Sequence, residues 1–225
     1  WISQGLFTSQ DDINNSPVQK FGTVAPGDIK YKDLSGDGQI DANDWTYLGK
    51  STFPKWMYGT GFTVSYHGFD LSTLFQGIAD VGIMANGSRI PAYMGAIGAG
   101  VVPFAGIGYP YNVMSIAEDR WTTQDPRQNA YYPRLTVAST TDNNYMNSSR
   151  WLKNGAFIRL KQASLGYNIV ADKIKKAGLN SLYVYVTGTN LLTFSKFKLW
   201  DPELGSDGAL YPITRTATFG IRFKF

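Results

Sequence analysis

The sequence has no cysteine and a single histidine, His67, among its 225 residues. The absence of cysteine excludes disulfide bonds and thiolate metal sites. His67 stands beside Gly68 between two segments of strand-like pattern, which is typical of a turn residue rather than of a catalytic one. Catalysis would have to rely on paired carboxylates, and Asp201 and Glu203 beside Trp200 are a weak signal for such a pair. We therefore expect that the protein is not an enzyme.

The chain also has few charges and no long apolar run. Charged residues make up 17% of the sequence, and the net charge is +4. No apolar run approaches the roughly 20 residues of a transmembrane helix, which excludes a helical membrane protein. No cluster of Lys and Arg has the pattern of a nucleic-acid-binding surface. We therefore expect no nucleic-acid partner.

Aromatic residues and glycine are abundant instead. The sequence contains 14 Tyr, 13 Phe, 6 Trp and 24 Gly. This composition suits a transmembrane β-barrel, in which only alternate residues of each strand face lipid. It suits a soluble carbohydrate-binding β-sandwich equally well. Composition alone leaves both classes open.

The last twelve residues, TRTATFGIRFKF, alternate with a period of two. Phe219, Ile221, Phe223 and Phe225 share one parity, and Thr218, Gly220, Arg222 and Lys224 share the other. Such alternation predicts a β-strand with one apolar face. An ordinary edge strand has the same pattern, but a barrel needs an apolar last strand that pairs with the first strand.

Similar alternation occurs earlier in the chain. Residues 56–66 and 69–76 alternate around His67-Gly68, which predicts a hairpin with a tight turn. Residues 157–169 and 182–190 predict two further strands, with a loop from about 194 to 212. Within 157–169 the apolar parity changes after Leu160, which indicates a bulge. We also expect a short helix within residues 5–19 and a short strand at 28–32.

These elements divide the chain into four segments. Residues 1–55 form a loop region, 56–80 a hairpin, 81–150 a long loop, and 151–225 three strands with their connections. Structureless loops as long as 81–150 are unusual and are either functional or disordered. The many aromatic residues of this loop argue against disorder.

Residues 33–44, DLSGDGQIDAND, follow the spacing of a calcium-binding loop. Gly38 stands at the sharp turn, and Asp44 takes the twelfth place, where glutamate is more common. Oxygen donors at this spacing suit Ca²⁺, which accepts six to eight ligands at flexible distances. A polar turn without metal remains the alternative. The predicted metal ligands are Asp33, Ser35, Asp37, Gln39, Asp41 and Asp44.

Several of these segments together resemble the SusC/RagA-type TonB-dependent transporters of Bacteroidetes. They are GDIKYKDLSGDGQID, WTYLGKSTFPKWMYGTGFTVSYHGFDLSTLFQG, FIRLKQASLGYNI, LYVYVTGTNLLTFSKFKLWDPE and TATFGIRFKF, in this order. The final eight residues also resemble the carboxy-terminal assembly signal of outer-membrane proteins. The residues of this barrel-closing signal are Thr218, Gly220, Phe223 and Phe225.

The resemblance implies an all-β fold: about five carboxy-terminal strands of an antiparallel transmembrane barrel of about 22 strands, with long extracellular loops. It implies a plug domain from an amino-terminal part that is missing here, through which the TonB complex acts, and a SusD-like lipoprotein that presents glycans or oligopeptides. It also implies an outer-membrane location in contact with lipid. It does not indicate which residues bind substrate.

An odd number of membrane crossings before a periplasmic carboxy terminus places residues 1–55 outside the cell. The long stretches 81–150 and 194–212 then also lie outside, and the short turns at 67–68 and 170–181 lie inside. Short periplasmic turns and long outer loops are the rule for such barrels. The alternative is a soluble or surface-attached, calcium-stabilised β-rich module that binds carbohydrate.

Overall fold

The computed structural model describes residues 1–86, 118–135, 143–170, 178–206, 208 and 211–225. The chain divides into two compact units. The loop unit comprises Trp1–Thr52, Gly82–Asn154 and Leu204–Leu210. The sheet unit comprises Phe53–Val81, Gly155–Glu203 and Tyr211–Phe225.

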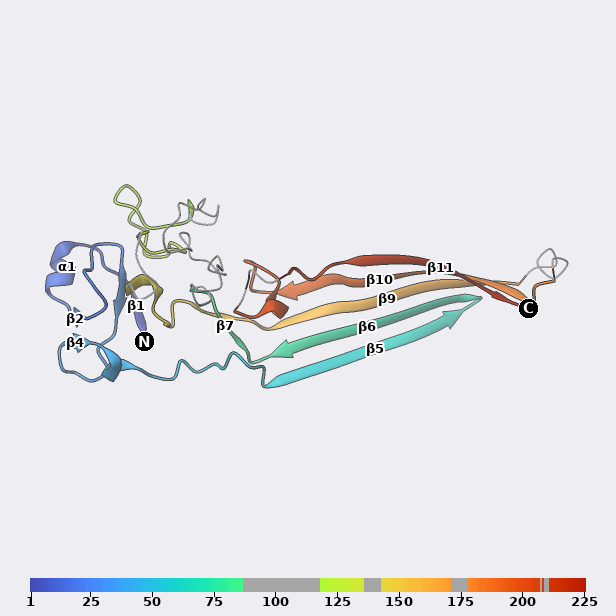
Figure 1. The fold of residues 1–225 in the computed structure, drawn as a ribbon, viewed down its shortest axis with the longest axis horizontal. Coiled ribbons are helices and arrows are strands. Elements are labelled where there is room, and N and C mark those ends of the chain that lie inside the picture. Colours follow the sequence, from blue (N-terminus) through green and yellow to red (C-terminus); the bar gives the residue numbers. More distant parts are fainter. Residues whose placement is uncertain (87–117, 136–142, 171–177, 207, 209–210) are drawn as a thin grey trace, which may run out of the picture. The chain divides into compact units, whose positions relative to one another are not determined.

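The sheet unit is built on one five-stranded antiparallel sheet with the order β11-β10-β9-β6-β5 (Figure 1). Its strands are β5 (Trp56–Tyr66), β6 (Phe69–Ala79), β9 (Phe157–Ile169), β10 (Ser181–Ser195) and β11 (Thr216–Lys224). Strands of about 9–11 residues are long enough to cross the hydrocarbon core of a membrane when tilted. The sheet confirms the prediction of about five antiparallel strands.

The hairpin between β5 and β6 turns at His67 and Gly68, as predicted. Both residues have positive φ, 47° and 86°. Two successive residues with positive φ are typical of the tight hairpin turns whose twist matches that of the flanking strands. From Tyr66 paired with Phe69, the register continues without a break to Trp56 paired with Ala79.

The predicted irregularity of β9 is confirmed. The pairing of β9 with β6 shifts between Leu74 and Phe75, and the pairing with β10 shifts between Thr189 and Leu192. Asn190 has a positive φ of 52° at this point. The predicted strand end at Asn190 is wrong, because β10 passes through the irregularity and pairs again from Leu192 to Ser195.

The loop unit contains short elements only. Its strands pair in twos: β1 (Ser3–Leu6) with β3 (Ile29–Tyr31), β2 (Val18–Gln19) with β4 (Gln39–Ile40), and β7 (Gly82–Met84) with β8 (Leu152–Asn154). Its helical turns are α1 (Gln10–Asn14), η1 (Ala42–Asp44) and η4 (Asn143–Tyr145), and η5 (Pro202–Leu204) lies at the boundary of the two units. The predicted short helix and short strand correspond to α1 and β3. Among the described residues, no helix is long and apolar enough to cross a membrane.

The loop unit has a hydrophobic core of its own, to which distant parts of the chain contribute. Phe7, Ile29 and Ile40 come from the first 44 residues, and Tyr132 and Trp151 come from beyond residue 120; all five are buried. The indole of Trp121 lies so close to Gly27 that a side chain at Gly27 would overlap it. The described residues of the two loop regions predicted separately, 1–55 and 81–150, therefore belong largely to one folded unit.

Candidate functional site

One face of the five-stranded sheet is apolar across all five strands. The register places Val64 of β5 opposite Leu71 of β6, and Leu71 opposite Leu165 of β9. Further along the sheet, Leu165 lies opposite Val186 of β10, and Val186 opposite Phe219 of β11. The bulge in β9 restores the alternation, so that Leu160 shares this face with Phe75 and Leu192. The side chains that the sequence alternation assigned to one face therefore form a continuous face across the five strands.

The apolar face is exposed in this chain. Phe219 is 81% exposed and Phe62 is 51% exposed. Exposed apolar patches larger than a few hundred Å² mark contact with a membrane or a protein. The other large exposed apolar side chains of this face are Trp56, Tyr58, Val64, Tyr66, Phe69, Leu71, Leu165, Tyr167, Leu192, Phe194, Ile221 and Phe223.

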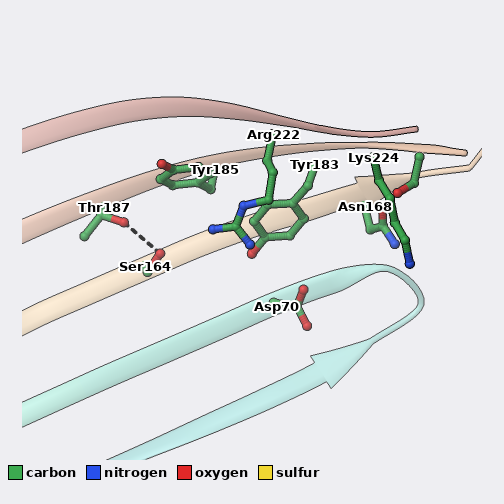
Figure 2. Close-up of a pocket in the computed structure, with 9 residues that line it drawn as sticks. Asp70, Ser164, Asn168, Tyr183, Tyr185, Thr187, Arg222 and Lys224 are labelled. Atoms are coloured by element: carbon green, nitrogen blue, oxygen red, sulfur yellow. Dashed lines mark hydrogen bonds between the residues drawn. The ribbon is translucent and has the colours of Figure 1, made fainter. Parts of the chain in front are cut away.

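The opposite face carries mostly polar side chains, with Met57 and Leu74 as exposed apolar exceptions, and has a hollow of about 580 Å³ (Figure 2). Ser164 and Thr187 share a hydrogen bond of 2.8 Å on this face. The rings of Tyr183 and Tyr185 stack at 5.8 Å, and the guanidinium of Arg222 lies 5.8 Å from the centre of the Tyr183 ring. The lining residues are Asp70, Ser164, Asn168, Ser181, Tyr183, Tyr185, Thr187, Arg222 and Lys224.

Two glycines make room for these tyrosines. A Cβ at Gly166 would overlap the phenol of Tyr183, and a Cβ at Gly220 would overlap the ring of Tyr185. Each tyrosine therefore lies flat over a glycine on the neighbouring strand. This arrangement gives a chemical reason for Gly220 that is separate from its predicted place in the barrel-closing signal.

The hollow combines positive charge with aromatic rings. Arg222 and Lys224 form no ion pair with any described residue, and the carboxylate of Asp70 accepts a hydrogen bond from the hydroxyl of Ser65. Such a surface can contact acidic or aromatic groups of another chain segment or of a solute.

The predicted barrel-closing residues lie in or just beyond β11. Thr218 pairs with Thr187, Gly220 with Tyr185, and Phe223 with Leu182. Phe225 follows the end of the strand and is 84% exposed. The structure therefore places Phe223 on the apolar face and Thr218 and Gly220 on the polar one.

The predicted calcium loop is folded by its own hydrogen bonds. Asp33 accepts hydrogen bonds from the amides of Gly36 and Gly38, at 2.6 and 2.9 Å, and from the hydroxyl of Ser35 at 3.2 Å. Asp37 and Asp41 each accept one from a backbone amide two residues further on.

Asp44 is the most enclosed of the predicted ligands, with no exposed surface. Its carboxylate accepts hydrogen bonds from the amides of Leu34, Ser35 and Asp41, at 2.7, 3.0 and 2.9 Å. Burial raises the pKa of Asp44, but these hydrogen bonds outweigh burial and leave its pKa below the ordinary value.

As placed in the structure, these side chains do not form a metal cage. No group of three or more Asp, Glu, His or Cys side chains in the described ranges is arranged to hold an ion. The carboxylates bind backbone amides, and these hydrogen bonds hold the turn. Gln39 lies in β4 and pairs with Val18. The calcium site stays a prediction from spacing.

Asp201 and Glu203, the weak candidates for a carboxylate pair, belong to a network of ion pairs. The guanidinium of Arg159 is 1% exposed; it pairs with Asp201 and lies 3.5 Å from Glu203. Lys161 lies 3.3 Å from Glu203. Arg159 and Lys161 have the same parity in β9, which could have indicated a shared partner. The network holds the connection between β10 and β11 against β9.

A second ion pair, in the loop unit, has no local sequence signal. Asp28 is 1% exposed and pairs with Arg134 through two hydrogen bonds of 3.0 and 2.9 Å. Asn144 donates to the same carboxylate at 2.7 Å. Asn143 donates to the carbonyl of Ile29 at 2.8 Å. These buried polar groups join Arg134, Asn143 and Asn144 to residues of β3 and the residue before it.

No family model matches the chain. Among curated proteins, the chain is 32% identical to TonB-dependent receptor P26 of Formosa agariphila over 98% of its own length. It is 28% identical to TonB-dependent receptor P3 of the same organism over 91% of its length. The chain belongs to the TonB-dependent receptors. It spans about a fifth of these relatives, 22% of P26 and 20% of P3.

Solved structures show the same fold for this TonB-dependent receptor chain. The RagAB peptide importer in its open-open state matches 100% of the chain and 22% of its own chain, with a TM-score of 0.65 and 20% identity. A second RagAB peptide transporter structure matches 86% of the chain, with a TM-score of 0.60 and 22% identity. The resemblance read from the sequence and the fold class are confirmed. Receptors and importers are not enzymes, as expected for this chain.

Proposed function

We propose that this chain is the carboxy-terminal wall and outer loop region of a TonB-dependent transporter in the outer membrane. The continuous apolar face of the sheet carries the proposal. Burial of apolar area is worth about 25 cal/mol per Å², and side chains such as Phe219, 81% exposed, bury little of theirs within the chain. Lipid is the medium that covers such a face on a barrel.

The edges of the sheet support a larger barrel. β5 and β11 each pair on one side only within the described sheet. An open strand edge in a membrane leaves backbone groups without hydrogen bonds, so a membrane sheet has to close. The curated relatives are about five times longer than the region matched here. The remaining strands and the plug are expected to come from the rest of the receptor.

We propose that the transporter imports oligopeptides or glycans together with a SusD-like surface lipoprotein, driven by the TonB complex. The fold likeness to a peptide importer supports this class of substrate. In this proposal the loop unit, which has its own core, carries the surface that the lipoprotein contacts. In this arrangement the polar face and its hollow line the interior of the barrel.

Uptake by a receptor deletion strain tests the transport proposal. Labelled oligopeptides and oligosaccharides should enter cells that carry the full receptor and TonB, and uptake should be lost without either. Isolation of the full receptor in detergent should bring the lipoprotein with it. Unchanged uptake in the deletion strain, or recovery of the receptor from the soluble fraction without detergent, contradicts the proposal.

The barrel-closing role of Phe225 is also a proposal, supported by its place immediately after β11. Deletion of Phe225 should reduce the amount of assembled receptor several-fold and leave uptake per assembled molecule nearly unchanged. Surface immunolabelling measures the first quantity, and uptake normalised to it measures the second. Normal surface levels after the deletion contradict this role.

Calcium at residues 33–44 is proposed from the spacing of the oxygen donors, with a structural role only. Elemental analysis of receptor purified without chelator should find about one Ca²⁺ per chain, and Asp37→Asn should lower this value. Asp37 is the position to change because its carboxylate accepts one hydrogen bond among the described residues, from the amide of Gln39. Its replacement therefore disturbs the fold of the loop little. A metal-free loop in anomalous diffraction, folded as described here, rejects the site.

A further inference from the structure

Two cations and two tyrosines meet in the loop unit, and none of them belongs to the predicted calcium loop. The rings of Tyr131 and Tyr132 lie 5.2 Å apart, and both contact Trp151, at 6.2 and 5.9 Å. The ammonium of Lys153 lies 5.0 Å from the centre of the Tyr131 ring. Arg150 donates from Nη2 to the carbonyl of Ala130, next to this ring pair. We refer to Tyr131, Tyr132, Arg150 and Lys153 as the tyrosine–cation cluster.

Three residues of this cluster carry buried hydrogen-bond donors without a partner in the described part of the chain: Tyr131, Tyr132 and Arg150. Most of the buried side-chain atoms that lack a partner within the described part of the chain belong to residues 121–150. Every one of these atoms in this region carries a hydrogen that it can donate. Buried donors in folded proteins are nearly always paired, so a group of unpaired ones indicates an acceptor that belongs there. The atoms are Nε1 of Trp121, the hydroxyl oxygens of Tyr131, Tyr132 and Ser148, and Nε of Arg150.

The cluster also lacks a balancing negative charge. Neither Arg150 nor Lys153 forms an ion pair with any residue in the described ranges. The carboxylate whose charge acts on Arg150 is Asp119, which itself pairs with Arg127 at 3.2 Å. The two cations therefore repel each other in a partly buried place.

The protonation of the groups agrees with this picture. Burial lowers the pKa of Lys153, and the neighbouring Arg150 lowers it further. Burial also lowers the pKa of Arg150. Burial raises the pKa of Tyr131 to about 12, so its hydroxyl keeps its proton and remains a donor at neutral pH. The pKa of Tyr132 is raised as well, with burial as the main cause.

We infer that the tyrosine–cation cluster binds a small anion, either a halide or a single carboxylate group. An anion accepts several hydrogen bonds at once and offsets both positive charges, whereas a water molecule accepts at most two and offsets neither. The anion has to be small because the cluster is enclosed: Tyr132 is 1% exposed. This site is independent of the proposed transport activity and of the calcium loop.

Bromide identifies the site directly because it scatters anomalously. Crystals of the full receptor soaked in sodium bromide should show an anomalous peak within hydrogen-bonding distance of Arg150 Nε and of a tyrosine hydroxyl. Addition of acetate distinguishes the two anions: loss of the peak assigns the site to carboxylates, and persistence of the peak assigns it to halides. Bromide at exposed lysines alone, or water at the cluster with no anomalous signal, overturns the inference.

Variants of the cluster test anion binding in solution. Tyr131→Phe removes one hydroxyl and keeps the ring, so bromide or acetate should stabilise this variant less than the parent receptor. Arg150→Gln should lower the affinity for the bound anion about tenfold or more, as expected for the loss of a charged hydrogen bond. Lys30→Gln is the matched control, since Lys30 belongs to the same unit and is already paired with Asp12 at 2.8 Å. Equal responses of the three variants to the anion contradict the site.

Discussion

The two units of this chain place their apolar side chains in opposite ways. In the loop unit, Phe7, Ile29 and Trp151 are each at most 1% exposed, as apolar side chains are in the core of a soluble domain. In the sheet unit, Phe62 and Phe219 are more than half exposed although the strands that carry them pair along their length with a neighbouring strand.

The difference shows how each unit obtains its stability. The loop unit buries apolar area within itself and fastens its segments with buried polar pairs such as Asp28 with Arg134. The sheet unit is held by its strand ladder, and its apolar side chains need an external apolar medium. A change in the core should therefore act on the loop unit in any solvent, whereas a change on the apolar face should act through the membrane.

The largest effect is expected from breaking the buried ion pair of the loop unit. Asp28→Ala leaves Arg134 without its partner and removes an acceptor of Asn144, so we expect a loss of about 3–5 kcal/mol in the stability of this unit. Hydrogen exchange of the amides in β1 and β3 measures the loss. Asp125→Ala is the control, because Asp125 forms an exposed pair with Arg127. An equal effect of the two changes contradicts a structural role for Asp28.

The next largest effect is expected from a charge on the lipid-facing side of the sheet unit. Phe62→Arg places a charge on the apolar face and should cost about 2–4 kcal/mol if the site lies near the membrane midplane. Thr63→Arg places the same charge on the polar face and should be tolerated. The folded fraction of the receptor, followed by its resistance to unfolding in detergent gels, gives the comparison. Equal loss of folded receptor for both variants means that the face assignment is wrong.

A smaller effect concerns packing within the polar face. Gly166→Ala introduces a Cβ that overlaps Tyr183, and the tyrosine has to move at a cost of about 1–3 kcal/mol. Gly59→Ala is the matched control in the same sheet, because its nearest neighbour would be 3.5 Å away. The denaturant midpoint of the folded receptor measures both. An unchanged midpoint for Gly166→Ala contradicts the close packing of Tyr183.

The smallest effect concerns a partly exposed ion pair of the loop unit. A hydrogen bond from Lys30 is the main cause of the lowered pKa of Asp12, with a further contribution from the amide of Thr8. Because the folded pKa lies below the unfolded one, the stabilisation is present above about pH 4 and is lost as the pH falls through the folded pKa. The contribution should be at most about 1 kcal/mol, since both side chains are about a quarter exposed.

Asp12→Asn should therefore flatten the pH dependence of loop unit stability below about pH 5. Hydrogen exchange of α1 between pH 3 and pH 6 measures it, after correction for the intrinsic exchange rate. The same pH dependence in the variant and the parent receptor contradicts the assignment.

The contrast between the units also explains what could be predicted from the sequence. The strand faces follow from a period of two, so Phe62, Leu165 and Phe219 could be assigned to one face from local pattern. The bulge in β9 was also predictable from local sequence, because the apolar parity changes after Leu160. The end of β10 could not be predicted in this way, because beyond Asn190 the strand is defined by its renewed pairing with β9.

The loop unit could not be derived in the same way. The pair of Asp28 with Arg134 joins residues 106 positions apart, and neither residue differs from an ordinary surface charge in its local sequence. The tyrosine–cation cluster likewise depends on how residues 131 and 150 come together. The spacing of residues 33–44 predicted oxygen donors in a turn, and the structure shows the turn. The spacing does not determine whether a calcium ion binds in this turn.

The central claim is that the apolar face of the sheet lies in lipid, and spin labels test it most directly. This part of the receptor has no cysteine, so introduced cysteines provide unique labelling positions within it. Labels at Phe62 and Phe219 should be more accessible to oxygen, which concentrates in lipid, and labels at Thr63 and Thr187 to a water-soluble nickel complex. If labels on both faces show equal access to the nickel complex, the sheet does not separate lipid from water and the account fails.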